Sequence, residues 1–211
     1  MSATAPPTPV LSRLSAADFP AAAADLAGLL ADTVADGASL GFLSPFGHAE
    51  AAAWWTDRVP AVAGGSLLVW LARDASPASS FSASPLGGVA ADAPAAVGTV
   101  SLALESRPNG RHRAEVVKLM VHPSARGRGL ARALLATAEA AAAAAGADLL
   151  LLDTETDSSA EHLYRSAGWT RYGVVPGYAA DPHGTLRDCS FFYKRPAPAA
   201  DRPGPGYSAA D

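Results

Sequence analysis

Residues 124–129 read Ser-Ala-Arg-Gly-Arg-Gly, and they separate an apolar strand pattern, Val116–Val121, from a long Leu- and Ala-rich helix pattern. A strand that leads through a glycine-spaced turn into a helix directs several unpaired backbone N–H groups at one point. The helix dipole adds partial positive charge there, and Arg126 and Arg128 reinforce the preference for an anion. The stretch therefore predicts a site for a phosphate or pyrophosphate at the strand–helix junction.

Other interpretations of this glycine pattern remain open. Many strand–helix connections use glycine only to turn the chain, so a purely structural role is one of them. Two rival phosphate-binding motifs fit less well. The chain has no GxxxxGK[ST], which argues against a Walker-type loop. Arg132 stands where a dinucleotide fingerprint has its third glycine, which disfavours close helix–strand packing around NAD.

Composition excludes several classes of protein. A chain of 211 residues suffices for one well-buried domain, and a net charge of −4 argues against a nucleic-acid partner. Cys189 is the only cysteine, so no internal disulfide can form, and its apolar surroundings predict a small buried residue rather than a nucleophile. The five histidines lack metal-ligand spacing, so we predict no metal site.

The chain shows no pattern typical of export or of membrane insertion. Met1–Val10 lacks a basic segment followed by an apolar one, and no apolar run is long enough to span a bilayer. We expect a cytoplasmic protein with no membrane partner.

The hydrophobic periodicity divides the chain into alternating helices and strands. Helices are predicted at Ser15–Ala35, at His48–Arg58, at Arg128–Ala145, and from the capping box at Ser158–Glu161 to Gly168. Strands are predicted at Leu67–Ala72, Val97–Leu104, Arg113–His122, Leu149–Leu152, Trp169–Val175 and Asp188–Lys194. Hairpin-paired strands followed by a helical crossover indicate a mixed sheet in a single α/β or α+β domain.

The predicted domain spans residues 10–195. Tails at 1–9 and 196–211 are rich in Ala, Pro and Gly and are expected to be disordered. Residues 75–95 have the same composition and no periodicity, so they are expected to form a flexible loop between two strands.

Three side chains are candidates for chemistry. Strand alternation places Glu115 on the face of Val117, Leu119 and Val121, where apolar neighbours would raise its pKa toward that of a useful base. Its structural alternative is an ion pair with Arg113 or Arg111.

The other two candidates come from later elements. Asp153 ends a buried strand, where ligands of parallel sheets gather, although turn residues are common there too. Tyr164 lies on an apolar helix stripe, either as a core residue or as a proton donor to a departing thiolate.

Aromatic residues at 42, 46, 54 and 55 either line a pocket or pack in the core. The segments Gly37–Trp55 and Val175–Leu186 are the ones we expect to shape an acceptor pocket.

Several motifs in a fixed order resemble a known family. Glu115-Val-Val-Lys-Leu-Met-Val-His-Pro-Ser-Ala-Arg-Gly-Arg-Gly, then Leu152-Asp-Thr-Glu, then Ala160-Glu-His-Leu-Tyr-Arg-Ser-Ala-Gly-Trp, resemble the GNAT superfamily of N-acetyltransferases. The family's loop pattern, [Q/R]xxGx[G/A], maps onto residues 124–129, with Ser124 in place of Gln or Arg. Within the superfamily the chain is most similar to the tabtoxin-resistance group, over roughly residues 14–194.

The resemblance implies a fold and a reaction. The fold would be a GNAT-like domain with a twisted, mostly antiparallel mixed sheet flanked by helices. The reaction would move the acetyl group of acetyl-CoA directly to an amine of a small molecule. Glu115 would act as base, Asp153 would orient the ammonium, and Tyr164 would protonate the CoA thiolate. The positions implied for the cofactor are Leu119, Met120, Val121, Arg126, Gly127, Arg128, Gly129, Leu130, Ala131 and Ser159.

Several alternatives stay open at this point. The chain could be a CoA-binding sensor that transfers nothing, a nucleotide-binding protein, or a protein N-terminal acetyltransferase. The biological role suggested by the resemblance is inactivation of a toxin or antibiotic. The sequence is compatible with a monomer or a homodimer.

Overall fold

The computed structural model describes residues 9–74 and 95–196. Apart from residues 9, 95 and 196, the expected tails at 1–9 and 196–211 and the expected loop at 75–95 lie outside these ranges. Within the described residues, no helix combines the length and the apolar character that a membrane crossing requires.

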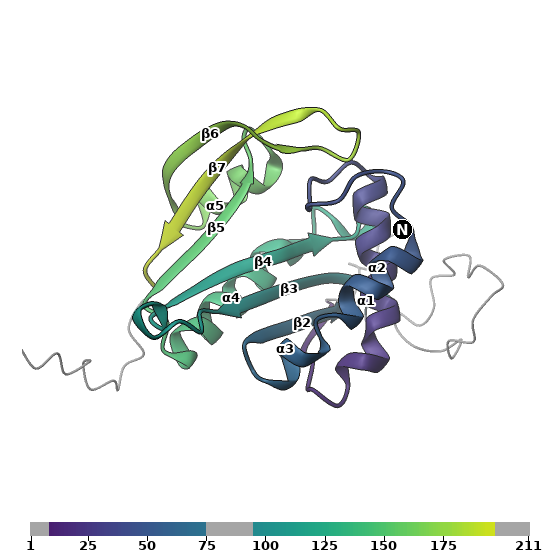
Figure 1. Ribbon diagram of the computed structural model, residues 1–211, viewed down its shortest axis with the longest axis horizontal. Helices are drawn as coiled ribbons and strands as arrows, with labels where there is room; N and C mark the ends of the chain where they lie inside the picture. Colours follow the sequence, from purple (N-terminus) through teal and green to yellow (C-terminus); the bar gives the residue numbers. More distant parts are fainter. Residues whose placement is uncertain (1–8, 75–94, 197–211) are drawn as a thin grey trace, which may run out of the picture.

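One seven-stranded sheet, in the order β1-β2-β3-β4-β5-β7-β6, organises the described chain (Figure 1). Only β4 and β5 run parallel, and every other neighbouring pair is antiparallel, so the expectation of a mixed, mostly antiparallel sheet is confirmed. The strands are β1 Val10–Arg13, β2 Leu67–Arg73, β3 Ala96–Leu104, β4 Arg113–Val121, β5 Leu149–Glu155, β6 Thr170–Ala180 and β7 Leu186–Lys194.

Helices cover both faces of this sheet and create two cores (Figure 1). Helices α1 (Phe19–Ala35), α2 (His48–Thr56) and α3 (Val59–Ala63) enclose one core, which we call the α1-side core. Helix α4 (Leu130–Ala145) and helix α5 (Ser159–Ser166) enclose the other, the α4-side core. Short 3₁₀ turns, η1 at Pro108–Gly110 and η2 at Pro123–Ala125, flank β4.

Strands β4 and β5 pair over only part of their length. Arg113–Glu115 align with Leu149–Leu151, whereas β4 continues to Val121 and β5 to Glu155. Figure 1 shows the two strands spreading apart toward these carboxyl ends, while β5 stays paired to β7. The centre of the sheet therefore opens where its only parallel pair ends.

Several boundaries differ from the sequence-based prediction. Strand β1 and helix α3 were not predicted, and the helix predicted from Ser15 begins at Phe19. Helix α4 begins at Leu130 instead of Arg128. Its N-cap residue Gly129 is left-handed, so the regular helix cannot extend further back.

Candidate active site

The loop between β4 and α4 has the geometry of an anion cradle. Gly127 and Gly129 both have φ of +75°, a left-handed conformation that costs glycine little. The first-turn N–H groups of α4 have no intrahelical partner, as at the start of any α-helix, and no side chain caps this one. They face a cavity of about 210 Å³, whose wall consists of Val121, Ala125, Arg126, Gly127, Gly129, Leu130, Ala131, Arg132 and Leu163.

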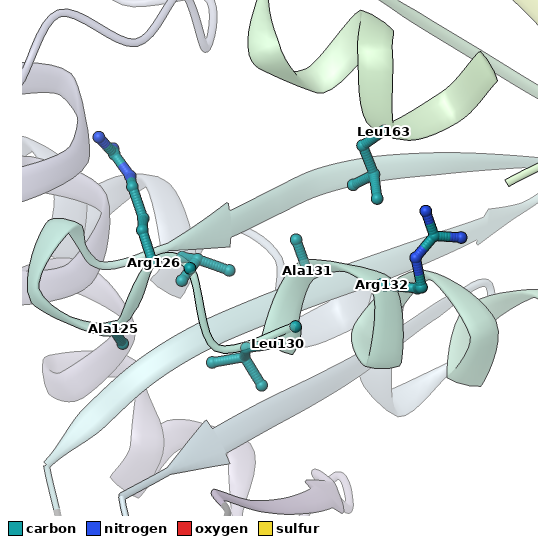
Figure 2. Close-up of a pocket in the computed structure, with 9 residues that line it drawn as sticks. Ala125, Arg126, Leu130, Ala131, Arg132 and Leu163 are labelled. Carbon is teal, nitrogen blue, oxygen red and sulfur yellow. The ribbon is translucent and has the colours of Figure 1, made fainter. Parts of the chain in front are cut away.

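Six of the ten residues predicted to bind the cofactor line this cavity: Val121, Arg126, Gly127, Gly129, Leu130 and Ala131. Figure 2 shows Leu163 of α5 facing Ala131 and Arg132 of α4 across it. The remaining four do not line it. Leu119 is partly buried against the α4-side core, and Met120 is buried in the α1-side core. The Arg128 side chain forms an ion pair with Asp74, and Ser159 is exposed at the start of α5.

The two loop arginines already have carboxylate partners. The Arg126 guanidinium lies 2.7 Å from a carboxylate oxygen of Asp36, and that of Arg128 lies 3.0 Å from Asp74. Their positive charge is therefore offset, and the backbone N–H groups are the main contribution of this loop to anion binding.

Glu115 and Asp153 approach each other from neighbouring strands. Glu115 aligns with Leu151, and Asp153 is two residues further along β5, on the same face. That face is opposite the α4-side core, which holds Val116 and Leu152. The ion pair suggested as an alternative role for Glu115 does not form with Arg113, because Arg113 binds Glu105 at 3.1 Å.

The surroundings raise the pKa of both carboxyl groups. Glu115 and Asp153 both keep exposed surface, but the surrounding chain removes part of the water around them. This partial desolvation raises the pKa of Glu115 and the negative charge of Asp153 raises it further, whereas Lys118 lowers it. Partial desolvation also raises the pKa of Asp153, again opposed by Lys118. A carboxylate with a raised pKa is a better proton acceptor near neutral pH than an ordinary one.

Tyr164 lies on the other side of the open strands, at the α4-side core. It is buried, and its ring packs against Trp169 and Phe192 with centroids 6.1 and 6.0 Å apart. Burial raises the pKa of its hydroxyl far above the usual range, and the charge of Asp153 raises it further. The hydroxyl is therefore a protonated donor at every physiological pH.

A β-bulge in β4 corrects one prediction. Strand alternation alone predicts that Glu115 shares a face with Leu119 and Val121, but the register between β3 and β4 shifts and Lys118 has φ of +53°. The extra residue turns Leu119 and Val121 toward the α4-side core and Met120 toward the α1-side core. Of the three residues that alternation predicted on the face of Glu115, only Val117 lies on that side of the sheet.

Lys118 is the residue of this site that the sequence analysis missed. It appeared only inside a quoted motif, although its charge within the otherwise apolar run Val116–Val121 was a usable signal. The rings of Phe42 and Trp54 lie beside its ammonium and pack edge-on against each other with centroids 5.8 Å apart. Phe46 stacks on Phe42 with centroids 4.2 Å apart. Trp55, by contrast, is fully buried and donates to the carbonyl of Leu26.

The Acetyltransferase (GNAT) family matches residues 50–169, which is more than half of the 211-residue chain. The chain belongs to the GNAT family. This match contains Glu115, the cradle, Asp153 and Tyr164, and it confirms the expectation of an acetyltransferase.

Solved structures share the fold across nearly the whole chain. A phosphinothricin acetyltransferase of the GNAT superfamily from Sinorhizobium meliloti, in complex with acetyl-CoA, has a TM-score of 0.67 at 20% identity, covering 94% of this chain and 95% of that one. The putative acetyltransferase yncA from Salmonella typhimurium, with acetyl-CoA, gives 0.63 at 19%, covering 93% and 98%. A ribosomal-protein-alanine N-acetyltransferase from Brucella melitensis gives 0.60 at 20%, covering 88% and 99%.

Proposed function

We propose that this GNAT enzyme transfers the acetyl group of acetyl-CoA to the amine of a small molecule by direct attack within a ternary complex. The observation that carries the proposal is that the candidate site residues lie on both sides of the sheet, at the place where β4 and β5 separate. An anion cradle and Tyr164 lie on the α4 side, and Glu115 and Asp153 lie on the other. Donor and acceptor would thus meet between β4 and β5.

The cradle would bind the pyrophosphate of acetyl-CoA. First-turn N–H groups of α4 and the positive end of its dipole suit a diphosphate, and left-handed Gly127 and Gly129 hold the loop open around it. The disturbed backbone at the bulge, residues 118–120, would offer N–H groups to the oxyanion, a contribution of about 3 kcal/mol for one good donor.

Glu115 would take a proton from the acceptor ammonium, directly or through a water, while Asp153 favours binding of that cation. The freed nitrogen attacks the thioester carbonyl carbon, a C–N bond forms, and the C–S bond breaks as Tyr164 gives its proton to the sulfur. Tyr164 would regain a proton from the nitrogen of the tetrahedral intermediate and stay neutral, and Glu115 would pass the proton of the ammonium to solvent. The reaction yields the acetylated amine and CoA, and it releases one proton to solvent. No enzyme nucleophile is required, and Cys189 is buried with a raised pKa.

A hydrogen bond between two loops supports our proposal of a small acceptor instead of a peptide. The α1–α2 loop and the β6–β7 turn, both within segments expected to shape the acceptor pocket, are joined by a 2.7 Å hydrogen bond from the N–H of Ser44 to the carbonyl of Pro182. Such a bridge restricts entry of an extended chain. An amino-acid-like toxin or antibiotic, as the tabtoxin-resistance likeness suggests, is the acceptor class we test first.

The experiment is an acetyl-transfer screen over small amines, β-lactam amino acids and N-terminal peptides, with product mass and released thiol as readouts. Wild-type transfer to small amines supports the proposal. Transfer to peptides alone would make the enzyme a protein N-terminal acetyltransferase, and binding of CoA without transfer would make it a sensor. Thermal stabilisation by ATP or NAD but not by CoA would assign the cradle to a nucleotide.

The role of Glu115 is tested by the pH profile. Because a base must be ionised, activity falls as pH drops through its pKa, and the raised pKa of Glu115 places this inflection above 4.5. Glu115→Gln should lower kcat/KM about 100-fold and abolish the inflection. Asp148→Asn is the control, since Asp148 is exposed and precedes β5 at the end away from Asp153. An unchanged profile in Glu115→Gln would remove Glu115 as base.

A further inference from the structure

Lys118 adopts a backbone conformation that its side chain does not favour. Together with Asp157 it is one of two non-glycine residues with positive φ in the described part of the chain. A left-handed conformation costs a residue with a Cβ about 1–2 kcal/mol. Such strain persists only where the surrounding contacts hold the residue in place, and it is often found at functional sites.

The Lys118 ammonium contacts the loop between α1 and α2. Its Nζ donates a 2.7 Å hydrogen bond to the carbonyl oxygen of Leu40. It also lies 5.1 Å from the ring centroid of Trp54 and 5.3 Å from that of Phe42, which is cation–π distance. The bulge in β4 therefore directs a positive charge onto one loop and the aromatic residues beside it.

The same loop reaches the far half of the sheet. Besides the bond from Ser44 to Pro182, the hydroxyl of Ser39 lies 3.5 Å from the carbonyl oxygen of Ala180. Figure 1 shows this loop next to the β6–β7 turn. Residues 37–46 thus connect Lys118 on β4 to β6, across the region where β4 and β5 separate.

We propose that Lys118 is a positioning residue for acetyl transfer: it fixes residues 37–46 as a wall of the acceptor site, and its charge offsets those of Glu115 and Asp153. This inference rests on the proposed function for its link to acetyl transfer. The fixation of the loop stands on the contacts of Lys118 with Leu40, Phe42 and Trp54 themselves.

Three charged groups define the balance at this point: the carboxyl groups of Glu115 on the same strand and Asp153 on β5, and the ammonium of Lys118. The positive charge of Arg58, which follows α2, lowers the pKa of Lys118 but is not among the charges that shift the two carboxyl groups. The charge of Asp153 also raises the pKa of the Tyr164 hydroxyl and of the Cys189 thiol, which therefore stay neutral near neutral pH. Removing the Lys118 charge therefore raises the pKa of both carboxyl groups.

The kinetic test compares Lys118→Met with Lys118→Arg. The methionine variant keeps the apolar stem but lacks both charge and donor. We expect its low-pH inflection to rise by about 1 pH unit and the acceptor KM to rise about tenfold, with the KM for acetyl-CoA within about twofold of wild type. The arginine variant should restore the inflection because it keeps the charge. An inflection and an acceptor KM that both match wild type in Lys118→Met would overturn the inference.

Arg58→Met provides a matched control. The Arg58 guanidinium lies 4.3 Å from the same Trp54 ring, but no described hydrogen bond links it to Leu40. This variant should leave the acceptor KM within about twofold of wild type. If it raises that KM as much as Lys118→Met does, the effect belongs to the aromatic cluster and Lys118 is not the positioning residue.

A second readout needs no activity. Carboxyl carbon NMR titration of the ligand-free protein should show the Glu115 and Asp153 pKa values rising in Lys118→Met relative to wild type. If the wild type acetylates no amine but this rise occurs, the proposed function fails while the charge balance holds. If neither value rises, the inference about Lys118 is wrong, whatever the enzyme acetylates. Urea unfolding of each variant confirms that the titrated protein is folded.

Discussion

At the scale of single residues, Tyr164 combines two roles that sequence patterns presented as alternatives. Its ring is a core residue, packed between Trp169 and Phe192, and its hydroxyl lies near enough to Asp153 for that charge to raise its pKa. We expect Tyr164→Phe to keep the fold and the acetyl-CoA affinity, because the ring contacts remain. It should lower kcat about 100-fold, since the thiolate then leaves without a proton donor.

Steady-state kinetics and calorimetric titration with acetyl-CoA measure the two quantities separately. Tyr172→Phe is the control, because Tyr172 is exposed on β6. An unaltered kcat in Tyr164→Phe would leave this residue with its packing role alone.

The sequence predicted part of the candidate site and could not predict the rest. Alternation placed Glu115 correctly only with respect to Val117. Asp153 was expected to end a buried strand, but β5 continues through it to Glu155. The charge of Lys118 inside an apolar run was visible in the sequence, but its left-handed conformation was not, because such a residue inside a strand has no signature when it is not glycine. The pairing of Arg126 with Asp36 and of Arg128 with Asp74 depends on tertiary packing, which motif reading does not contain.

At the scale of elements, helix α4 has a left-handed glycine at each end. Gly129 precedes its first turn with φ of +75°, and Gly146 follows its last turn with φ of +96°. Alanine at position 127, 129 or 146 should therefore lower the free energy of unfolding by about 1 kcal/mol. Only Gly127→Ala and Gly129→Ala should also weaken acetyl-CoA binding, by about tenfold or more, because they alter the cradle.

Gly146→Ala is a close control, since it places the same conformational cost on the same helix away from the cavity. Urea unfolding gives the stability, and calorimetry gives the affinity. An equal loss of affinity in Gly146→Ala would mean that helix stability, and not cradle geometry, governs binding.

The elements with strong periodicity were predicted well, and the errors have local causes. Strand β1 is a four-residue, largely exposed edge strand, too short to show alternation. The strand predicted at Trp169–Val175 continues as β6 through Pro176 to Ala180, with a register shift between Val175 and Ala179. A bulge accommodates Pro176, which has no N–H for the ladder, so a turn signal became part of a strand.

At the scale of the whole molecule, the opening between β4 and β5 leaves the sheet with few backbone bonds at its centre. Helix α4 holds the two halves together from one side. One Glu139 carboxylate oxygen accepts from the indole N–H of Trp169 at 2.7 Å, and the other accepts from Nζ of Lys194 at 2.6 Å. Lys194 also donates to the carbonyl of Ala167. Glu139 thus joins α4 to the start of β6 and the end of β7.

This bridge predicts a stability effect separable from catalysis. Glu139→Gln keeps the shape but removes the charge, so the free energy of unfolding should fall by about 2 kcal/mol. Asp148→Asn, whose 4.0 Å ion pair with Arg195 is exposed, should change it by less than about 0.5 kcal/mol. The low-pH inflection of Glu139→Gln should match wild type, because Glu139 does not face Glu115.

Acetyl-CoA should compensate for the loss of this bridge. In the proposed complex the ligand contacts α4 at the cradle and α5 at Tyr164, so it spans the same two halves that Glu139 joins. Binding at 100 times Kd adds about 2.7 kcal/mol to the free energy of unfolding. Saturating acetyl-CoA should then restore Glu139→Gln to at least the stability of the unliganded wild type, as measured by urea unfolding. If the ligand stabilises wild type but not Glu139→Gln, the bridge is needed to form the binding site itself, and its role is not confined to stability.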